Sequence, residues 1–435
     1  MTWLNKDIAK KWRLEGERYA SDVNAFVHKG LSLGWDQVDE RDLMEDRRTE
    51  LADLVFNMII GANKAGDLAL LREELPPATW PLAANFQNRM QAVKSVFFIN
   101  DKAIVFRGGS TWEDGYVYVA TSKGTKHFKQ YTLVGRSPNR EVYAFVDEKG
   151  ISTMKKLDEN LNGEQIHHFS WEFIYKRIKE LNIPISLTDE FPHHQLTEVI
   201  PFSSGRKVIL ISSSGTFLVT AEQLTVLDPD PKAIEEWLKE DDLGDLEITM
   251  EHAALSYDEK WIVCGSQSSN HLIYDHEGKF ISELYPDSSY PHFSWFTSDS
   301  KKVICNSCHF YNGISFAAPL TNLKSGEEFP LIDDNSRVYA ATAREGEVYF
   351  GDAYGYVRAA SDGGSFLWQY FVGGTIAGMD ISSDGKWLAV GTYSGMLHLI
   401  ELNIEERDLY TISTANHKEK ARWIVWKNTN DVYRW

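Results

Sequence analysis

The chain repeats itself, and this repetition constrains its fold more than any other feature of the sequence. Residues 255–268 read LSYDEKWIVCGSQS, and residues 381–394 read ISSDGKWLAVGTYS. Six positions are identical between the two segments, among them an Asp, a Lys-Trp pair and a Gly. After one residue of slippage, His271-Leu-Ile matches His398-Leu-Ile. The chain is therefore built from copies of one structural unit.

Short apolar runs recur from about residue 90 onward, separated by clusters of Gly, Ser, Asp and Asn. This alternation is typical of strands and turns. Seven copies align on one residue before their second strand, at Lys102, Arg140, Lys207, Lys260, Lys301, Gly346 and Lys386. Four of the six intervals lie near the roughly 40–45 residues of a four-stranded propeller blade. The sequence therefore predicts a mainly β fold, a seven-bladed β-propeller.

Two of the intervals are longer, and each contains a predicted helical insertion between blades. The apolar stripe of the first insertion consists of Trp171, Ile174, Tyr175, Ile178 and Leu181. The second insertion opens with Asp230 as its N-cap and Pro231 at its first helical position. Two further strands are predicted in the tail, at residues 421–426 and 431–435, and one of them is expected to pair with the first blade and close the ring.

The residues before the repeats follow a helical period. Asn5 is a plausible N-cap, Gly30 and Gly61 are candidate helix ends, and Pro76-Pro77 cannot continue a helix. Three helical runs are predicted, over residues 6–30, 36–61 and 68–75. The chain thus divides into an α-helical N-terminal domain, a helical hairpin over residues 1–80, and a propeller over residues 81–435.

The last copy carries a resemblance to a known family. Residues 367–391, LWQYFVGGTIAGMDISSDGKWLAVG, resemble the repeats of WD-repeat and quinoprotein-type β-propellers. The resemblance covers roughly residues 90–402 and departs from the strict WD pattern, because the Gly-His opening and the Trp-Asp closing dipeptide are both missing. Trp261 and Trp387 stand at the start of the second strand instead. It implies a propeller fold, and propellers of this kind serve many functions.

Composition excludes several classes of protein. The 435 residues carry 45 basic and 63 acidic side chains, a formal net charge of −18, which disfavours general nucleic-acid binding. No apolar stretch approaches the roughly 18 residues of a membrane span. Three cysteines cannot build a disulfide framework. With no apolar leader at its start, the chain is predicted to be cytoplasmic. Its many aromatic residues are assigned to core packing.

Motifs for catalysis or cofactor binding are weak. The sequence contains no G-x-S-x-G, G-x-G-x-x-G or P-loop motif. Residues 305–309, CNSCH, match the haem-attachment pattern, but the repeat alignment places Cys305 at an apolar strand position, where a free cysteine packs as a small hydrophobe. Neither His167-His168 nor His193-His194 can readily chelate one metal, because adjacent strand residues point to opposite faces. We therefore predict no catalytic residue, no cofactor and no metal site.

Propeller enzymes remain the alternative. Propeller lactonases hold calcium at the central channel with a few Asp, Asn and Glu side chains, and this chain has carboxylates in abundance. A metal-dependent hydrolase or lactonase would need such a channel site. A channel plugged by apolar side chains would exclude it.

The second insertion concentrates negative charge. Between Asp228 and Glu251 ten acidic residues face only two basic ones, Lys232 and Lys239. One interpretation is a solvated helix pinned to the propeller rim. The other is an electrostatic dock for a basic protein, with an apolar anchor near its centre. The candidate partner-binding residues are Glu235, Glu236, Trp237, Glu240, Asp241, Asp242 and Asp245.

These features together predict a non-catalytic protein-binding propeller. A rigid ring that displays many variable loops suits recognition of another protein. An acidic chain of this kind could neutralise a basic toxin in the manner of an immunity protein, and the same features fit a scaffold. The predicted partner is a basic protein, with no nucleic acid and no membrane involved.

Overall fold

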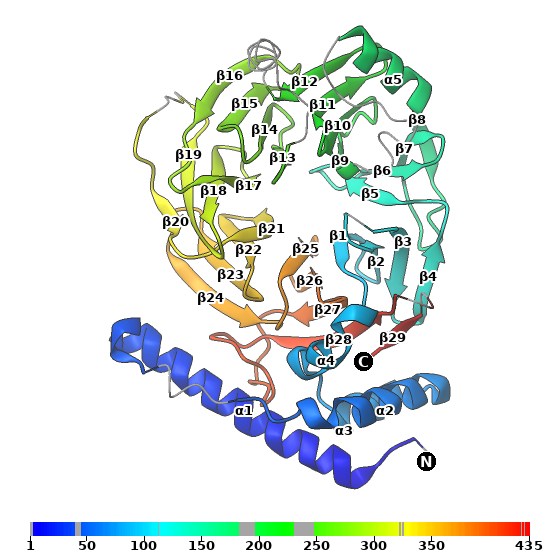
Figure 1. Cartoon of the computed structure of the whole chain (residues 1–435), viewed down its shortest axis with the longest axis vertical. Coiled ribbons are helices and arrows are strands. Elements are labelled where there is room, and N and C mark those ends of the chain that lie inside the picture. The colour runs from blue at the N-terminus through cyan, green and yellow to red at the C-terminus, as the bar shows by residue number, and fades with distance from the viewer. Residues whose placement is uncertain are drawn as a thin grey trace, which may run out of the picture.

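Seven antiparallel sheets stand around a central axis like the blades of a propeller (Figure 1). The computed structural model describes residues 3–39, 45–111, 113–181, 196–229, 248–321, 323, 326–427, 429 and 431–435. In every blade the strands follow one another in chain order, and the first strand lies nearest the axis. The prediction of a seven-bladed β-propeller is confirmed.

The bounds of the strands follow the predicted repeats. Blade 1 consists of β1 (Val93–Asn100), β2 (Ala103–Gly108), β3 (Tyr116–Thr121) and β4 (Gly124–Phe128), and blade 2 of β5 (Leu133–Arg136), β6 (Val142–Asp147), β7 (Gly150–Lys155) and β8 (Glu164–Ser170). Blade 3 consists of β9 (Leu196–Pro201), β10 (Lys207–Ser212), β11 (Gly215–Thr220) and β12 (Leu224–Asp228), and blade 4 of β13 (His252–Leu255), β14 (Trp261–Gly265), β15 (His271–Asp275) and β16 (Phe280–Leu284). Blade 5 consists of β17 (Tyr290–Phe296), β18 (Lys302–His309), β19 (Asn312–Pro319) and β20 (Leu331–Asp333), and blade 6 of β21 (Val338–Arg344), β22 (Glu347–Asp352), β23 (Tyr356–Ser361) and β24 (Phe366–Phe371). Blade 7 consists of β25 (Ile376–Ile381), β26 (Trp387–Thr392), β27 (Met396–Glu401), β28 (Lys418–Val425) and β29 (Val432–Arg434).

The repeated Ser-x-Asp residues form the turn between the first and second strands of a blade. In blade 7 the hydroxyl of Ser382 donates to Asp384 (2.6 Å), and the backbone N–H of Trp387 donates to the Ser382 hydroxyl (2.9 Å). Blade 4 makes the same bonds with Ser256, Asp258 and Trp261. The identical residues thus hold one local turn, which is why they recur at the blade period.

The prediction for the ring closure was wrong. β28 pairs with β27 and β29 pairs with β28, so both tail strands belong to blade 7. Blade 1 is complete without them, because β1–β4 form its whole sheet. The ring closes by packing of β1 against β25 and β26 and by an isolated bridge between Met90 and Trp426. The tail therefore lengthens one blade and does not join two.

The N-terminal segment is helical, as predicted, although its boundaries differ. Its helices are α1 (Lys6–Leu33), α2 (Ala52–Ala65), α3 (Leu68–Glu74) and α4 (Thr79–Phe86), with short 3-10 turns at Trp35–Gln37, Thr49–Leu51 and Gln87–Arg89. Asn5 caps α1, and its side chain accepts from two backbone N–H groups. Gly30 and Gly61 do not end helices: both lie inside them, where Trp35 and Trp3 pack against them and leave no room for a Cβ.

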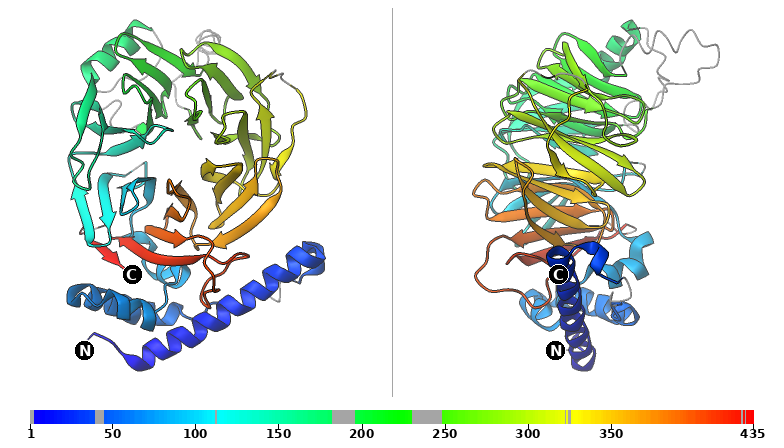
Figure 2. Two further views of the ribbon diagram at one scale, coloured as in Figure 1. Left: turned by 180° about the vertical axis from the view of Figure 1, so that it is seen from behind. Right: turned by 90° about the vertical axis from the view of Figure 1, so that its left-hand side faces the viewer.

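The helical head, defined as residues 3–39 and 45–89, packs against the outer edge of blade 7 (Figures 1 and 2). Asn63 exchanges two hydrogen bonds with the backbone of Arg434, at 2.7 and 2.9 Å. Asn24 likewise bonds the backbone at Thr411 (2.9 Å) and Ser413 (3.0 Å). These contacts hold the head in one place on the ring. The domain division at residue 80 stays a prediction.

The insertions have different outcomes. The first is α5 (Trp171–Glu180), capped by Ser170. Its buried Trp171, Ile174 and Ile178 and the partly buried Tyr175 confirm most of the predicted stripe, but Leu181 is the C-cap and is 40% exposed. The helix predicted after Pro231 lies outside the described residues.

Within the part of the chain that the structure describes, no helix is long and apolar enough to cross a membrane.

Candidate functional site

Exposed aromatic side chains gather on the face of the ring that carries the turns between the second and third strands. Phe310 and Tyr311 form the turn between β18 and β19 and are 72% and 66% exposed. Tyr354 and Tyr393 occupy the equivalent turns of blades 6 and 7. We define the aromatic patch as Met250, Phe310, Tyr311, Tyr339, Tyr354 and Tyr393. Exposed apolar side chains that lie together on a surface are candidates for an interaction site.

Close contacts join the members of the aromatic patch. The rings of Tyr311 and Tyr354 lie 6.3 Å apart, and those of Tyr339 and Tyr393 lie 5.9 Å apart. The Tyr354 hydroxyl donates to Asn312 across the gap between blades 5 and 6 (3.2 Å). These contacts join the aromatic members of the patch across blades 5, 6 and 7, and Met250 adds the segment that leads into blade 4.

Arg337 contacts three members of the aromatic patch, Met250, Phe310 and Tyr339. Its guanidinium donates to the carbonyl of Phe310 and lies 3.4 Å from the sulfur of Met250. The same group stands 5.2 Å from the ring centroid of Tyr339, a cation–π contact. Its Nε donates to Nε2 of His292 (3.0 Å). One arginine thus links the turns to the buried interior.

A chain of neutral histidines lies beneath the aromatic patch. His252 donates from Nδ1 to the carbonyl of Met250 (3.0 Å), so its Nε2 accepts from the hydroxyl of Ser294 (3.2 Å). Ser294 in turn accepts from Nδ1 of His271 (3.0 Å), and Nε2 of His271 accepts from Ser307 (3.2 Å). Because each bond fixes the direction of the next, a single tautomer satisfies the chain.

Burial keeps these histidines uncharged. It lowers the pKa of His252 to about 4 and that of His271 well below its usual value. For His292, burial and the neighbouring charge of Arg337 lower the pKa to about 3. His292 donates from Nδ1 to the carbonyl of Val338 (2.7 Å) and accepts from Arg337, and a second ring proton would break that acceptance. The neutral form is part of the folded structure.

Acid should therefore destabilise the protein through this network. Folded pKa values near 4 and 3 lie below the unfolded value of 6.5, so the unfolded chain binds more protons. The stability that the neutral histidines provide is complete above pH 6.5 and is lost as the pH falls from 6.5 toward 4. Each contributes up to about 1.4 kcal/mol per pH unit. Urea midpoints measured between pH 7 and pH 5 check this expectation.

The matched variants are His252→Gln and His276→Gln. His276 is exposed, with its side chain beside Glu277. The first variant should show a shallower fall in stability with pH than the wild type, and the second should keep the wild-type slope. Equal slopes in all three proteins would contradict the role of His252.

The central channel contains a cavity of about 210 Å³. Asp380 lies at the end of this cavity that is farther from the aromatic patch. It accepts two hydrogen bonds from Arg136, at 2.7 and 2.8 Å, and a third from Arg140 (3.2 Å). It also accepts from the backbone N–H of Phe98 (2.8 Å). Burial opposes the charge on Arg136, but the charge of Asp380 outweighs it and raises the pKa of the guanidinium. This cluster ties blade 7 to blades 1 and 2.

The predicted partner-binding residues cannot be placed on this surface. Glu235, Glu236, Trp237, Glu240, Asp241, Asp242 and Asp245 all lie outside the described residues, as do His193 and His194. The chain returns at Ile248, whose N–H donates to the carbonyl of Ser213 (2.7 Å), and reaches the aromatic patch at Met250. The end of the acidic insertion therefore meets the patch.

The other sequence candidates are structural. Cys264, Cys305 and Cys308 are free and buried, and burial raises the pKa of all three thiols, as expected of packed cysteines. His168 bonds Ser152 on the neighbouring strand (3.0 Å). Among the described residues there is no group of three His, Cys, Asp or Glu side chains that could hold a metal.

The aromatic patch was missed by sequence reasoning, which assigned the aromatic residues to the core. That assignment holds for buried strand residues such as Phe316 and Phe350. The overlooked signal was position: Phe310-Tyr311 stands between two strands, and Tyr354 and Tyr393 stand at the equivalent places in the next two copies. A turn has no interior to fill, so a pair of large aromatic side chains there faces solvent.

Comparison with known proteins finds similarity to solved structures only. No protein-family model matches the chain, and no curated protein matches it. The chain is similar to the β-propeller domain of Myceliophteria thermophila Cps50 (Swd1), at 14% identity and a TM-score of 0.48, over 72% of this chain and 98% of that one. It is similar to the WD40 β-propeller domain of Doa1, at 14% identity and a TM-score of 0.47, over 72% of this chain and 93% of that one. By its own seven sheets, six of four strands and one of five, the chain is a seven-bladed β-propeller.

Proposed function

We propose that this chain is a non-catalytic protein-binding propeller that presents the aromatic patch to a basic protein partner. The observation that carries the proposal is the exposed pair Phe310 and Tyr311, which stand on a turn whose Phe310 carbonyl accepts a hydrogen bond from Arg337. Aromatic side chains on a rigid support bury much area at low entropic cost, and they are frequent among interface hot spots.

Charge supports a basic partner. The formal net charge is −18, and the acidic insertion returns to the described chain beside Met250. A basic protein would be drawn to this face at long range, and the aromatic patch would supply the short-range contact. Neutralisation of a basic toxin and assembly of a scaffold both use such a surface. Three free, buried cysteines suit a reducing compartment, and we propose a cytoplasmic location.

Replacing both Phe310 and Tyr311 with alanine should weaken partner capture about tenfold or more, with little change in stability, because both side chains are mostly exposed. The measurement is capture on immobilised protein from the native host, identified and quantified by mass spectrometry. The matched control replaces Phe280 and Ile281, an exposed apolar pair on the outer strand of blade 4. Equal losses in both variants would contradict the aromatic patch as the docking surface.

A second variant separates the acidic insertion from the aromatic patch. It reverses four charges of the insertion, Glu235, Glu236, Asp241 and Asp242, to lysine. A basic partner should be lost from this variant as well. Retention of the partner by the reversed variant, or capture of an acidic partner by the wild type, would overturn the electrostatic part of the proposal.

A further inference from the structure

The wall of the central channel combines apolar and aromatic residues with hydroxyl and charged groups. The first strands of all seven blades line its cavity of about 210 Å³. The half-buried apolar and aromatic residues of this lining include Ile200, Ala254, Phe293 and Tyr339. A charge in such a narrow space is poorly solvated, so it needs a partner nearby.

Glu198 lines this cavity, and the charge of Lys94 is the cationic influence on its carboxylate. It stands at the third position of β9, which starts at the face of the aromatic patch. Among the described residues, no hydrogen bond or ion pair reaches its carboxylate. Burial raises the pKa of Glu198, because the ionised carboxylate loses its solvation there.

A second carboxylate increases the negative charge at the channel mouth. Glu251 lies directly before β13, and burial, together with the charge of Glu198, raises its pKa. Lys94 attracts both groups, but its ammonium is engaged elsewhere: it donates to Thr111 (3.3 Å) and stands 5.8 Å from the ring centroid of Tyr393. Arg136, at the far end of the channel, is paired with Asp380. The mouth therefore has carboxylate charge in excess.

An organic cation matches this arrangement. A metal would need more ligands than the described residues bring together. A guanidinium or ammonium on an apolar stem could instead pair with Glu198 and lie against the rings of Tyr339 and Phe293, which also line the cavity. The hydroxyls of Ser95 and Thr342 offer further acceptors on the same wall.

We infer that the central channel receives a lysine or arginine side chain of the partner, which enters from the aromatic patch and pairs with Glu198. The inference rests on the proposed function for its occupant. It adds that one inserted side chain, and not surface charge alone, fixes the register of the complex.

The test uses small probes in place of the unidentified partner. Butylguanidinium and butylammonium carry the two candidate head groups, and butylurea is a neutral match for the former. Calorimetric or NMR titration of the full chain should show binding of at least one cation and no binding of the urea. Glu198→Gln should weaken cation binding about tenfold or more. Glu148→Gln, at an exposed turn of blade 2, should leave it unchanged.

The outcomes separate this inference from the proposed function. Equal binding by wild type and Glu198→Gln, equal binding of the urea, or no binding of either cation would overturn the inference, whatever the partner assay shows. Cation binding that depends on Glu198, in a protein whose partner capture ignores the Phe310 and Tyr311 substitutions, would support the site and overturn the docking surface. A thermal melt of Glu198→Gln at or above the wild-type temperature would show that the fold is intact.

Discussion

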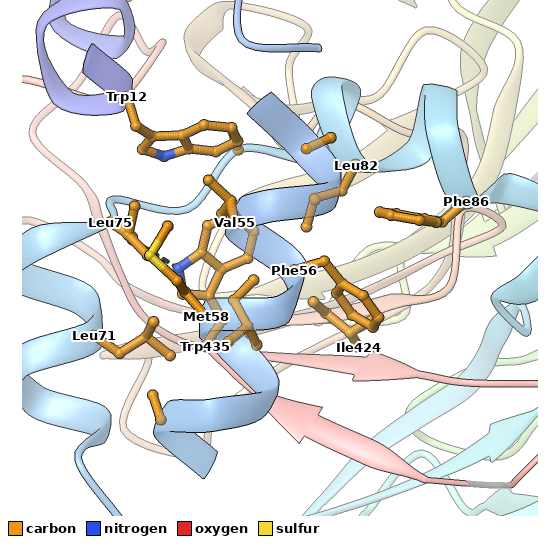
Figure 3. Packing of buried hydrophobic residues seen from close by; sticks show 14 of the residues in the cluster. Trp12, Val55, Phe56, Met58, Leu71, Leu75, Leu82, Phe86, Ile424 and Trp435 are labelled. Atoms are coloured by element: carbon orange, nitrogen blue, oxygen red, sulfur yellow. Dashed lines mark hydrogen bonds between the residues drawn. The ribbon is translucent and has the colours of Figure 1, made fainter. Parts of the chain in front are cut away.

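Replacing Trp435 with alanine should lower the free energy of unfolding by about 3–5 kcal/mol, because it removes a fully buried indole between the head and blade 7. The ring lies 6.1 Å from that of Trp12, and its N–H donates to the carbonyl of Leu75 (2.7 Å) (Figure 3). The backbone N–H of Trp435 donates to the backbone carbonyl of Arg422 (2.7 Å), and this hydrogen bond fixes the end of the strand pairing. Urea-induced unfolding, followed by circular dichroism, measures the loss.

Trp80→Ala is the matched control, since Trp80 belongs to the same head but is 60% exposed. Its effect should stay within about 0.5 kcal/mol. Proteolysis supplies a second readout: the head of the Trp435 variant should be cleaved at lower protease concentration than that of the control. Similar stability of the two variants would mean that the head is held by its polar contacts and not by this core.

Asp380→Asn should cost about 3–5 kcal/mol, because it leaves the buried guanidinium of Arg136 without a counter-charge. The substitution preserves the volume of the side chain, so the loss reports on charge and not on packing. The effect should extend over three blades, because Asp380 contacts Arg136 of blade 2 and the backbone of Phe98 in blade 1. Chemical unfolding at constant salt measures it.

Two further proteins make the interpretation specific. Asp101→Asn, at the exposed turn after β1, changes the same charge and should alter stability by less than about 0.5 kcal/mol. Adding Arg136→Met to Asp380→Asn should recover part of the loss, since the isolated cation is then removed. An additive result from the double variant would show that the two side chains are not coupled.

The repeat predicted the blades because its residues act locally. Ser382, Asp384 and Trp387 bond one another within six residues, so their pattern is visible without knowing what surrounds them. Trp261 and Trp387 begin second strands, as the alignment placed them. Cys305 is buried in a second strand, as its register with the other copies required.

Helix ends were less predictable, because packing against other parts of the fold decides them. Gly30 and Gly61 look like helix ends in sequence, yet each lies within a helix where an indole packs against it, Trp35 in one case and Trp3 in the other. Helix α4 begins at Thr79, two residues after Pro77, and its Leu82 and Phe86 are buried in the core of the head. The local pattern of apolar residues does not show which side chain packs against each glycine.

In the candidate site, too, some features can be read from the sequence and others depend on contacts within the ring. The charge of the second insertion can be read from composition, and its placement on the ring stays a prediction. The sequence shows an aromatic pair at residues 310–311, but only the ring places Tyr354 and Tyr393 of the next two blades beside it. Glu198 is one carboxylate among many in the sequence, and it becomes distinctive only inside a channel built by seven strands.

The sequence by itself determined the number of blades, the turns within them and the helical nature of the head, because hydrogen bonds between near neighbours carry that information. The tertiary structure alone decided where the head docks, which strands the tail joins and which side chains share the channel. Those outcomes depend on contacts between residues far apart in the chain, such as Trp12 with Trp435 and Arg136 with Asp380. Burial then gives each contact its energy, and burial is a property of the assembled ring.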